Sequence, residues 1–260
     1  MLRSINASDP TRLTALVAGL LYLLTFASSI PAAILLSPVL TNPAYIASPG
    51  VDSQISLAAF LDLVNGFAAM GTAIALFTIV KRQHEGFALG FVATRLFEAG
   101  TLAIGILAML SVVTLRQAAV TATDPASLVA VGQGLVAVRD WAFVVGTGMA
   151  GFNALMLGTV LYRSHLVPRA IPALGLIGAP IFLTAVSAKV LGADLGATTQ
   201  GLAVAPIFIW ELAVGLWMTF KGFRAAAPIV IAAKAAQAAD EGRGSTPVTR
   251  PSIAAEAGAA

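Results

Sequence analysis

The stretch FALGFVATRLFEAGTLAIGILAMLSVVTL, which is Phe87–Leu115, decides the fold class of this chain. Its only charged residues are Arg95 and Glu98, and it is longer than the about 20 apolar residues that carry an α-helix across the hydrocarbon core of a bilayer. Polar and apolar residues do not alternate along it, as they would in the strands of an outer-membrane barrel. The stretch therefore predicts a transmembrane helix.

Five further long apolar segments lie on either side of this one. Their approximate bounds are Leu13–Leu36, Ile55–Val80, Val136–Tyr162, Ala170–Leu191 and Ala203–Phe220. The composition agrees with so many spans, because 58% of the 260 residues are hydrophobic and only 10% are charged. Soluble domains carry about 25% charged residues, so an ordinary soluble enzyme and a disordered chain are both excluded. The sequence predicts an all-α, polytopic membrane helix bundle of six transmembrane helices.

Basic residues mark one side of the predicted membrane domain. Of the 15 lysines and arginines, 11 lie before the first apolar segment, in alternate connections or after the last segment. They are Arg3, Arg12, Lys81, Arg82, Arg163, Arg169, Lys221, Arg224, Lys234, Arg243 and Arg250. Because cytoplasmic connections carry the excess of positive charge, both termini are predicted to be cytoplasmic.

The chain divides into a cytoplasmic N-terminal segment (residues 1–12), a six-helix transmembrane domain (residues 13–223) and a tail (residues 224–260). The tail is rich in Ala and in Gly, Ser, Thr and Pro, so we expect a disordered cytoplasmic tail without a core. A signal peptide is the competing interpretation of the first apolar segment. That segment continues to Leu36, beyond the about 7–15 apolar residues of a signal peptide, and cleavage would leave five spans and break the charge pattern.

Charged and amide residues inside the predicted spans are the candidate functional residues, because they are rare and costly in a bilayer. The first group is Arg95, Glu98, Asn153 and Glu211. All four lie about 12–16 Å from the cytoplasmic ends of their helices, at a rise of about 1.5 Å per residue. They therefore share a layer near the middle of the membrane.

This mid-membrane layer has two interpretations. Arg95 and Glu98 are three residues apart and can pair on one helix face, which leaves Glu211 without an evident partner. Desolvation favours a neutral carboxyl group, so one glutamate is a candidate for holding a proton. The layer is either a ligand or proton site, or a structural tie in which Arg95 bridges both glutamates and joins the third and sixth helices.

A second group lies nearer the predicted outer face. It consists of Asp62, Asn65, Arg139, Asp140 and Lys189. At the same rise these residues are about 22–34 Å from the cytoplasmic helix ends, where long side chains reach the interface. Asp62 and Asn65 are one helical turn apart and are able to line an outward-facing vestibule. Asp62, Asn65 and Asp140 join the first group as candidate substrate- or ion-binding residues.

No motif predicts an enzyme, a metal site or a cofactor. The chain has no cysteine, and its histidines, His84 and His165, lie in different connections, so we expect neither a metal site nor a cofactor. Gly146, Gly148 and Gly151 match a dinucleotide-binding pattern, but that pattern needs a preceding strand. Inside an apolar helical run we interpret these glycines as helix-packing residues. We expect no catalytic residue and no nucleic-acid partner.

Two functions are compatible with this sequence, both within a lipid bilayer. In the first, the protein is a small-solute or ion- or proton-coupled transporter, or a membrane ligand-binding protein, with the layer around Arg95 as its site. In the second, it is a non-catalytic scaffold or accessory subunit that binds another membrane protein or a second copy of the chain. Water access to Glu98 or Glu211 would favour the first, and hydrogen bonds to every carboxylate oxygen would favour the second. A membrane-embedded enzyme is a third hypothesis without a supporting feature.

Four stretches of the chain resemble a known family. They are LLYLLTFASSIPA in the first span, RLFEAG in the third, LMLGTVLYRSHLVPRAIPALGLIGA across the fourth and fifth, and PIFIWELAVGLWMTFKGF in the sixth. These stretches resemble a bacterial membrane family, the domain-of-unknown-function 4386 group, over roughly Thr11–Phe223. Members also resemble this chain at Arg95, Glu98 and Glu211.

The most specific of these stretches is LYRSHLVPR. Members resemble Y-R-S-G-x-L-P-R there, whereas this chain has His165 in place of the usual glycine and Val167 in place of the usual leucine. The resemblance implies a six-helix fold and a location in the bacterial cytoplasmic membrane. It implies no activity, because none is assigned to the family.

Overall fold

The computed structural model describes residues 10–48, 50–119, 125–228, 230–232 and 234–235. In that part of the chain it consists of six long α-helices and one short 3-10 helix, without a β-strand. The elements are α1 (Pro10–Thr41), η1 (Tyr45–Ala47), α2 (Asp52–Val80), α3 (Glu85–Ala119), α4 (Pro125–Ser164), α5 (Ala170–Val190) and α6 (Gly196–Phe220). All six α-helices are long and apolar enough to cross a membrane, which confirms the predicted all-α, multi-pass membrane fold. The start of the N-terminal segment and most of the predicted tail lie outside the described residues.

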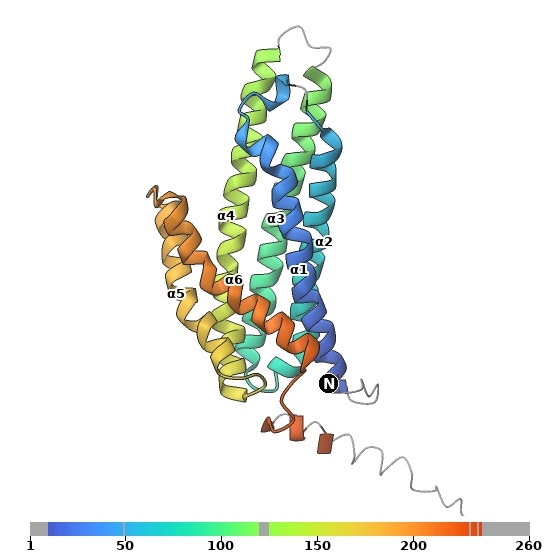
Figure 1. The fold of residues 1–260 in the computed structure, drawn as a ribbon, viewed down its shortest axis with the longest axis vertical. Coiled ribbons are helices and arrows are strands. Elements are labelled where there is room, and N and C mark those ends of the chain that lie inside the picture. The colour runs from blue at the N-terminus through green and yellow to red at the C-terminus, as the bar shows by residue number, and fades with distance from the viewer. Residues whose placement is uncertain (1–9, 49, 120–124, 229, 233, 236–260) are drawn as a thin grey trace, which may run out of the picture.

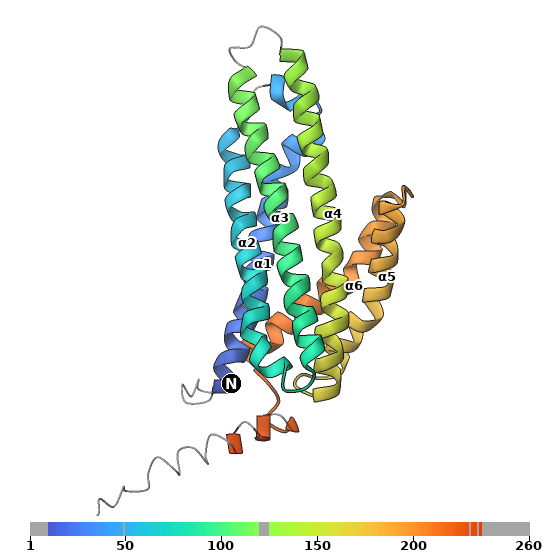
Figure 2. The ribbon, with the colours of Figure 1, turned by 180° about the vertical axis from the view of Figure 1, so that it is seen from behind.

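The six helices follow one another around a ring. α1 packs against α2 and α6, α3 packs between α2 and α4, and α5 packs between α4 and α6. In both views α1–α4 stand as a tall bundle, while the hairpin of α5 and α6 joins it near one end and leans away from it toward the other (Figures 1 and 2). All six helices therefore come together near the end where the hairpin joins.

Helix length differs between the two parts of the fold. α3 and α4 have 35 and 40 residues, which correspond to about 50–60 Å at the usual rise, whereas α5 has 21 residues, or about 30 Å. The hydrocarbon core of a bilayer is about 30 Å thick. α5 is therefore just long enough to cross it, and α3 and α4 rise beyond the α5–α6 hairpin (Figure 1).

The start of α1, the α2–α3 and α4–α5 connections and the end of α6 lie together at one end of the molecule (Figure 1). We call it the basic end, because these segments carry Arg12, Lys81, Arg82, Arg163, Arg169, Lys221 and Arg224. Arg12 Nη1 and Nη2 donate to Met218 O at 3.1 Å and Thr219 O at 2.8 Å, so Arg12 satisfies carbonyls that the C-terminus of α6 leaves free. The orientation of this end toward the cytoplasm stays a prediction.

The chain remains in contact with the bundle beyond Phe223, where the transmembrane domain is predicted to end. Arg224 N donates to Leu166 O at 2.9 Å, and Ala227 and Val230 are buried. The segment after α6 is thereby fastened to the α4–α5 connection.

That connection contains a left-handed turn at His165. The φ of His165 is 56°, the only positive φ among the described non-glycine residues. This conformation costs a residue with a Cβ about 1–2 kcal/mol, which explains why glycine suits the position. The histidine keeps the turn, and its Nε2 lies 2.7 Å from Arg169 Nη2.

Replacing His165 by glycine is expected to raise the free energy of unfolding by about 0.5–1 kcal/mol, because relief of the left-handed strain exceeds the entropy cost of a glycine. The measurement is the thermal midpoint of the purified protein in detergent. His165→Ala is the control, since it removes the contact with Arg169 but keeps the Cβ. An equal gain with alanine would show that strain is not the cause.

The glycines of GTGMAG lie inside α4 and face neighbouring helices. Gly146 faces α3, and Gly148 and Gly151 face α5. A Cβ at Gly151 would come within 2.7 Å of Leu183 Cγ, which is closer than packed side chains approach. The interpretation of these glycines as helix-packing residues is confirmed.

Candidate functional site

Arg95 lies at the centre of a polar cluster inside the ring of helices. Its side chain comes from α3 and is only 2% exposed. Nη1 donates to Glu98 Oε2 at 2.9 Å, one turn along the same helix, and Nη2 donates to Glu211 Oε1 on α6 at 2.6 Å. Arg95 therefore bridges both glutamates and joins α3 to α6.

Glu98 is also held from α4. Asn153, which is fully buried, donates from Nδ2 to Glu98 Oε2 at 3.0 Å. Thr94 donates from Oγ1 to Asn153 Oδ1. The structure thus brings together all four residues of the predicted mid-membrane layer and adds Thr94 to them.

Aromatic rings cover the guanidinium group. Arg95 Cζ lies 5.2 Å from the ring centroid of Tyr22 on α1 and 5.7 Å from that of Phe91 on α3, within the range of cation–π attraction. The sequence analysis missed both rings and Thr94. Phe91 precedes Arg95 by one helical turn, and this spacing was the available signal. Nothing in the sequence places α1 beside Arg95.

The two glutamates are not fully satisfied by the cluster. Their side chains are 21% (Glu98) and 15% (Glu211) exposed. Oε1 of Glu98 and Oε2 of Glu211 accept no hydrogen bond from a described residue, and neither is a fully buried unpaired atom. Each glutamate therefore presents one oxygen to a space beside the cluster. With one guanidinium and two carboxylates, the fully ionised cluster carries a single net negative charge.

That space is a pocket of about 270 Å³, which we call the carboxylate pocket. Residues of all six helices line it. Its polar wall includes Asn65, Arg95, Glu98 and Glu211, and its aromatic wall consists of Phe26, Phe143, Phe182 and Phe208. The ring of helices therefore encloses a charged cluster together with room for a ligand.

A second pocket of about 260 Å³ lies between α4 and the α5–α6 hairpin, and we call it the hairpin pocket. It shares Phe143, Thr147, Phe182 and Val204 with the carboxylate pocket. The two spaces therefore adjoin. Lys189, near the end of α5, also lines the hairpin pocket, and its Nζ donates to Gln200 Oε1 at 3.3 Å. The adjoining pockets thus have carboxylates at one end and an ammonium group at the other.

The predicted outer group does not form one site. Asn65 lines the carboxylate pocket with the inner residues, whereas Asp62 does not line it and instead interacts electrostatically with Arg139. Arg139 is largely buried, and its Nη1 donates to Asp140 Oδ1 at 3.2 Å. The side chain of Asp140 is 53% exposed. The vestibule predicted for Asp62 and Asn65 stays a prediction, and of the two only Asn65 lines the carboxylate pocket.

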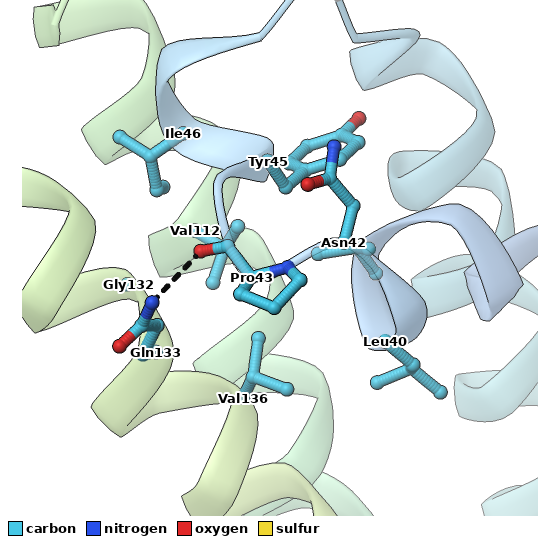
Figure 3. Close-up of a pocket in the computed structure, with 10 residues that line it drawn as sticks. Leu40, Asn42, Pro43, Tyr45, Ile46, Val112, Gly132, Gln133 and Val136 are labelled. Carbon is cyan, nitrogen blue, oxygen red and sulfur yellow. Dashed lines mark hydrogen bonds between the residues drawn. The ribbon is translucent and has the colours of Figure 1, made fainter.

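A third pocket has a volume of about 170 Å³ (Figure 3). The end of α1 and η1 line one side of it, and α3 and α4 line the other. Gln133 Nε2 donates to Pro43 O at 3.1 Å beside it. No Asp, Glu, Lys or Arg is among its lining residues. Burial and the neighbouring Asp52 carboxylate raise the pKa of Tyr45, so its phenol is neutral at neutral pH. This pocket offers apolar and amide contacts and no charge for an ion.

Among the described residues, no group of three or more His, Asp or Glu side chains is placed to hold a metal ion.

Comparisons with curated proteins and with solved structures gave no match. A family model matches residues 17–222, a range that contains the whole cluster around Arg95 and all or most of each helix. The chain therefore belongs to the family described as Domain of unknown function (DUF4386).

Proposed function

We propose that the carboxylate pocket binds a cation, which is a proton or a small positively charged solute, and that the protein is a transporter or ligand-binding protein for it. The observation that carries this proposal is the pair of free oxygens, Glu98 Oε1 and Glu211 Oε2, beside a pocket of about 270 Å³. We place the protein in the bacterial cytoplasmic membrane with its basic end inside, because membrane proteins carry excess Lys and Arg on that side.

The electrostatics of the cluster favour a cation over an anion. Both terminal nitrogens of Arg95 are already engaged by glutamates, and its side chain is 2% exposed. The remaining guanidinium nitrogen, Nε, has no hydrogen-bond partner but is buried, so an anion would face the more exposed carboxylates instead. A cation would compensate the net negative charge, and such attraction is stronger in a medium of low dielectric constant than in water.

A purely structural role for the cluster is the alternative, in a scaffold or accessory subunit. The bridge from Arg95 to Glu98 and Glu211 suits that role, since buried polar groups often tie membrane helices together. A structural tie does not need a pocket beside it or an unbonded oxygen on each carboxylate. These two features favour the binding role.

The test is the binding of tetramethylammonium to the purified protein in detergent, measured by isothermal titration calorimetry. We expect binding that tightens from acidic to alkaline pH, because protons compete for the carboxylates. Glu98→Gln and Glu211→Gln are each expected to weaken it by about tenfold or more, equivalent to about 1.4 kcal/mol. Asp140→Asn is the matched control, since Asp140 is exposed and does not line the pocket.

Protons are tested in the same samples. The thermal midpoint of the wild type is expected to depend on pH through Glu211, and Glu211→Gln is expected to reduce that dependence. If tetramethylammonium, sodium and potassium all fail to bind, and Glu211→Gln keeps the pH dependence of the wild type, the cation proposal is wrong and the structural role gains support.

A further inference from the structure

The walls of the carboxylate pocket suit an organic cation better than a bare ion. Four phenylalanines line it, and two of them, Phe26 and Phe208, meet edge to face with centroids 4.9 Å apart. Aromatic faces attract organic cations and also provide apolar contact. A metal ion in a protein takes oxygen or nitrogen ligands instead, and the described aromatic wall supplies none.

The volumes point the same way. The carboxylate pocket and the hairpin pocket measure about 270 Å³ and 260 Å³ and share four lining residues. A water molecule occupies about 30 Å³ of liquid volume, and small-molecule sites begin at about 300 Å³. The adjoining spaces therefore have room for a charged group and a hydrocarbon body several carbon atoms long.

Charge gives such a ligand a direction. Glu98 and Glu211 lie at one end of the adjoining pockets, and the ammonium group of Lys189 lies at the other. A cationic group is attracted to the glutamates and repelled by Lys189. Its apolar body is then left in the hairpin pocket, against Phe143 and Phe182.

The pockets also face the region from which an amphiphile would come. Phe143, Val204 and Phe208 line them and are 46%, 39% and 42% exposed in the isolated chain. They come from α4 and α6, and the hairpin of α5 and α6 leans away from the α1–α4 bundle (Figure 2). In a bilayer this surface meets hydrocarbon chains, in which an amphiphilic ligand accumulates.

We infer that the ligand is an amphiphilic organic cation, whose charged group binds between Glu98 and Glu211 and whose hydrocarbon body occupies the hairpin pocket. This inference rests on the proposed function and narrows its substrate class. The charged group satisfies the two free carboxylate oxygens, and the body fills the apolar space between α4 and the hairpin.

The experiment compares three probes on the full-length protein in lipid nanodiscs, by isothermal titration calorimetry with empty nanodiscs subtracted. Octyltrimethylammonium carries the charge and a body, tetramethylammonium carries only the charge, and octyl sulfate carries the same chain with the opposite charge. We expect octyltrimethylammonium to bind at least about tenfold more tightly than tetramethylammonium, since its chain adds apolar surface that is buried on binding. Octyl sulfate is expected not to bind.

Two matched variants on α6 test the position of the body. Val204→Trp adds a ring to a residue that lines both pockets, whereas Ile209→Trp adds the same ring to an exposed residue that lines neither. Val204→Trp is expected to weaken octyltrimethylammonium binding by about tenfold and tetramethylammonium binding by less. Ile209→Trp is expected to change neither, and thermal midpoints check that both variants fold.

The outcomes separate this inference from the function on which it rests. The inference of an amphiphilic ligand is wrong if the two cations bind with equal affinity, if the two Trp variants have equal effects, or if octyl sulfate binds. Each of these results leaves the proposed cation site in place. If neither cation binds, and Glu211→Gln leaves the pH dependence of the thermal midpoint unchanged, the cation site itself is wrong. If Val204→Trp does not fold, the comparison of the three probes on the wild type still decides the inference.

Discussion

Replacing Arg95 by methionine is expected to lower the free energy of unfolding by about 3–5 kcal/mol, the usual cost of removing one partner from a buried ion pair. Arg95 is the only described cation hydrogen-bonded to Glu98 and Glu211, at 2.9 Å and 2.6 Å. Without it, two carboxylates face each other in a largely enclosed site. Methionine keeps much of the packing against Tyr22 and Phe91, so the loss reports mainly the charge. The measurement is chemical or thermal unfolding in detergent.

The control is a triple variant, Arg95→Met with Glu98→Gln and Glu211→Gln. It removes the whole charged network, and replacing a complete buried network with neutral groups is often nearly neutral for stability. We therefore expect the triple variant to regain most of what Arg95→Met loses. If Arg95→Met is as stable as the wild type, the carboxylates relax without their partner and the bridge contributes little to the stability of the fold.

Gly19→Ala is expected to destabilise the protein by about 1–3 kcal/mol, the usual cost of overpacking a tight contact. A Cβ at Gly19 would lie 2.5 Å from the backbone nitrogen of Thr219 and 2.9 Å from the carbonyl oxygen of Gly215. Backbone atoms of α6 cannot move aside as a flexible side chain does, so α1 and α6 must separate. Because Glu211 lies about two turns before Thr219 on α6, the separation is also expected to disturb its bond to Arg95. Thermal unfolding and cation binding are both measured.

Gly100→Ala is the matched control for this substitution. Gly100 also lies within a transmembrane helix, but a Cβ there would meet no atom within 4 Å. Alanine is a better helix former than glycine by about 0.5–1 kcal/mol, so Gly100→Ala is expected to stabilise the protein slightly. The same change of side chain is thus predicted to have opposite signs at the two sites. A loss of stability at Gly100, or none at Gly19, would contradict this account of the α1–α6 contact.

The helices and the Arg95 cluster could be predicted from the sequence, and the reasons are physical. The length of an apolar run is set by the thickness of the bilayer, so six spans could be read directly. Charges inside those runs are costly, so Arg95, Glu98 and Glu211 stood out, and their similar depth predicted that they share a layer. The structure brings them together with Asn153.

The carboxylate pocket could not be predicted from the sequence, because it depends on how whole helices are arranged relative to one another. Asn65 was assigned to an outer vestibule by counting residues from a helix end, and the structure places it in the carboxylate pocket. The leaning of the α5–α6 hairpin, which opens the adjoining spaces, has no local sequence signature. Tyr22 was missed for the same reason, since its contact with Arg95 depends on where α1 lies in the ring of helices. His165 keeps a turn that its own residue type disfavours, so local propensity was a poor guide there.

The order of biosynthesis gives the two glutamates different tasks. Arg95 and Glu211 are 116 residues apart in sequence, so at about 5–20 residues per second α6 leaves the ribosome about 6–23 s after the middle of α3. During that interval Arg95 already sits in a nascent membrane helix, and its partner one turn away, Glu98, can neutralise it within that helix. Glu211 arrives last and closes the ring. Glu98 is therefore the partner available to Arg95 as soon as α3 is made, and Glu211 becomes available only when α6 is made.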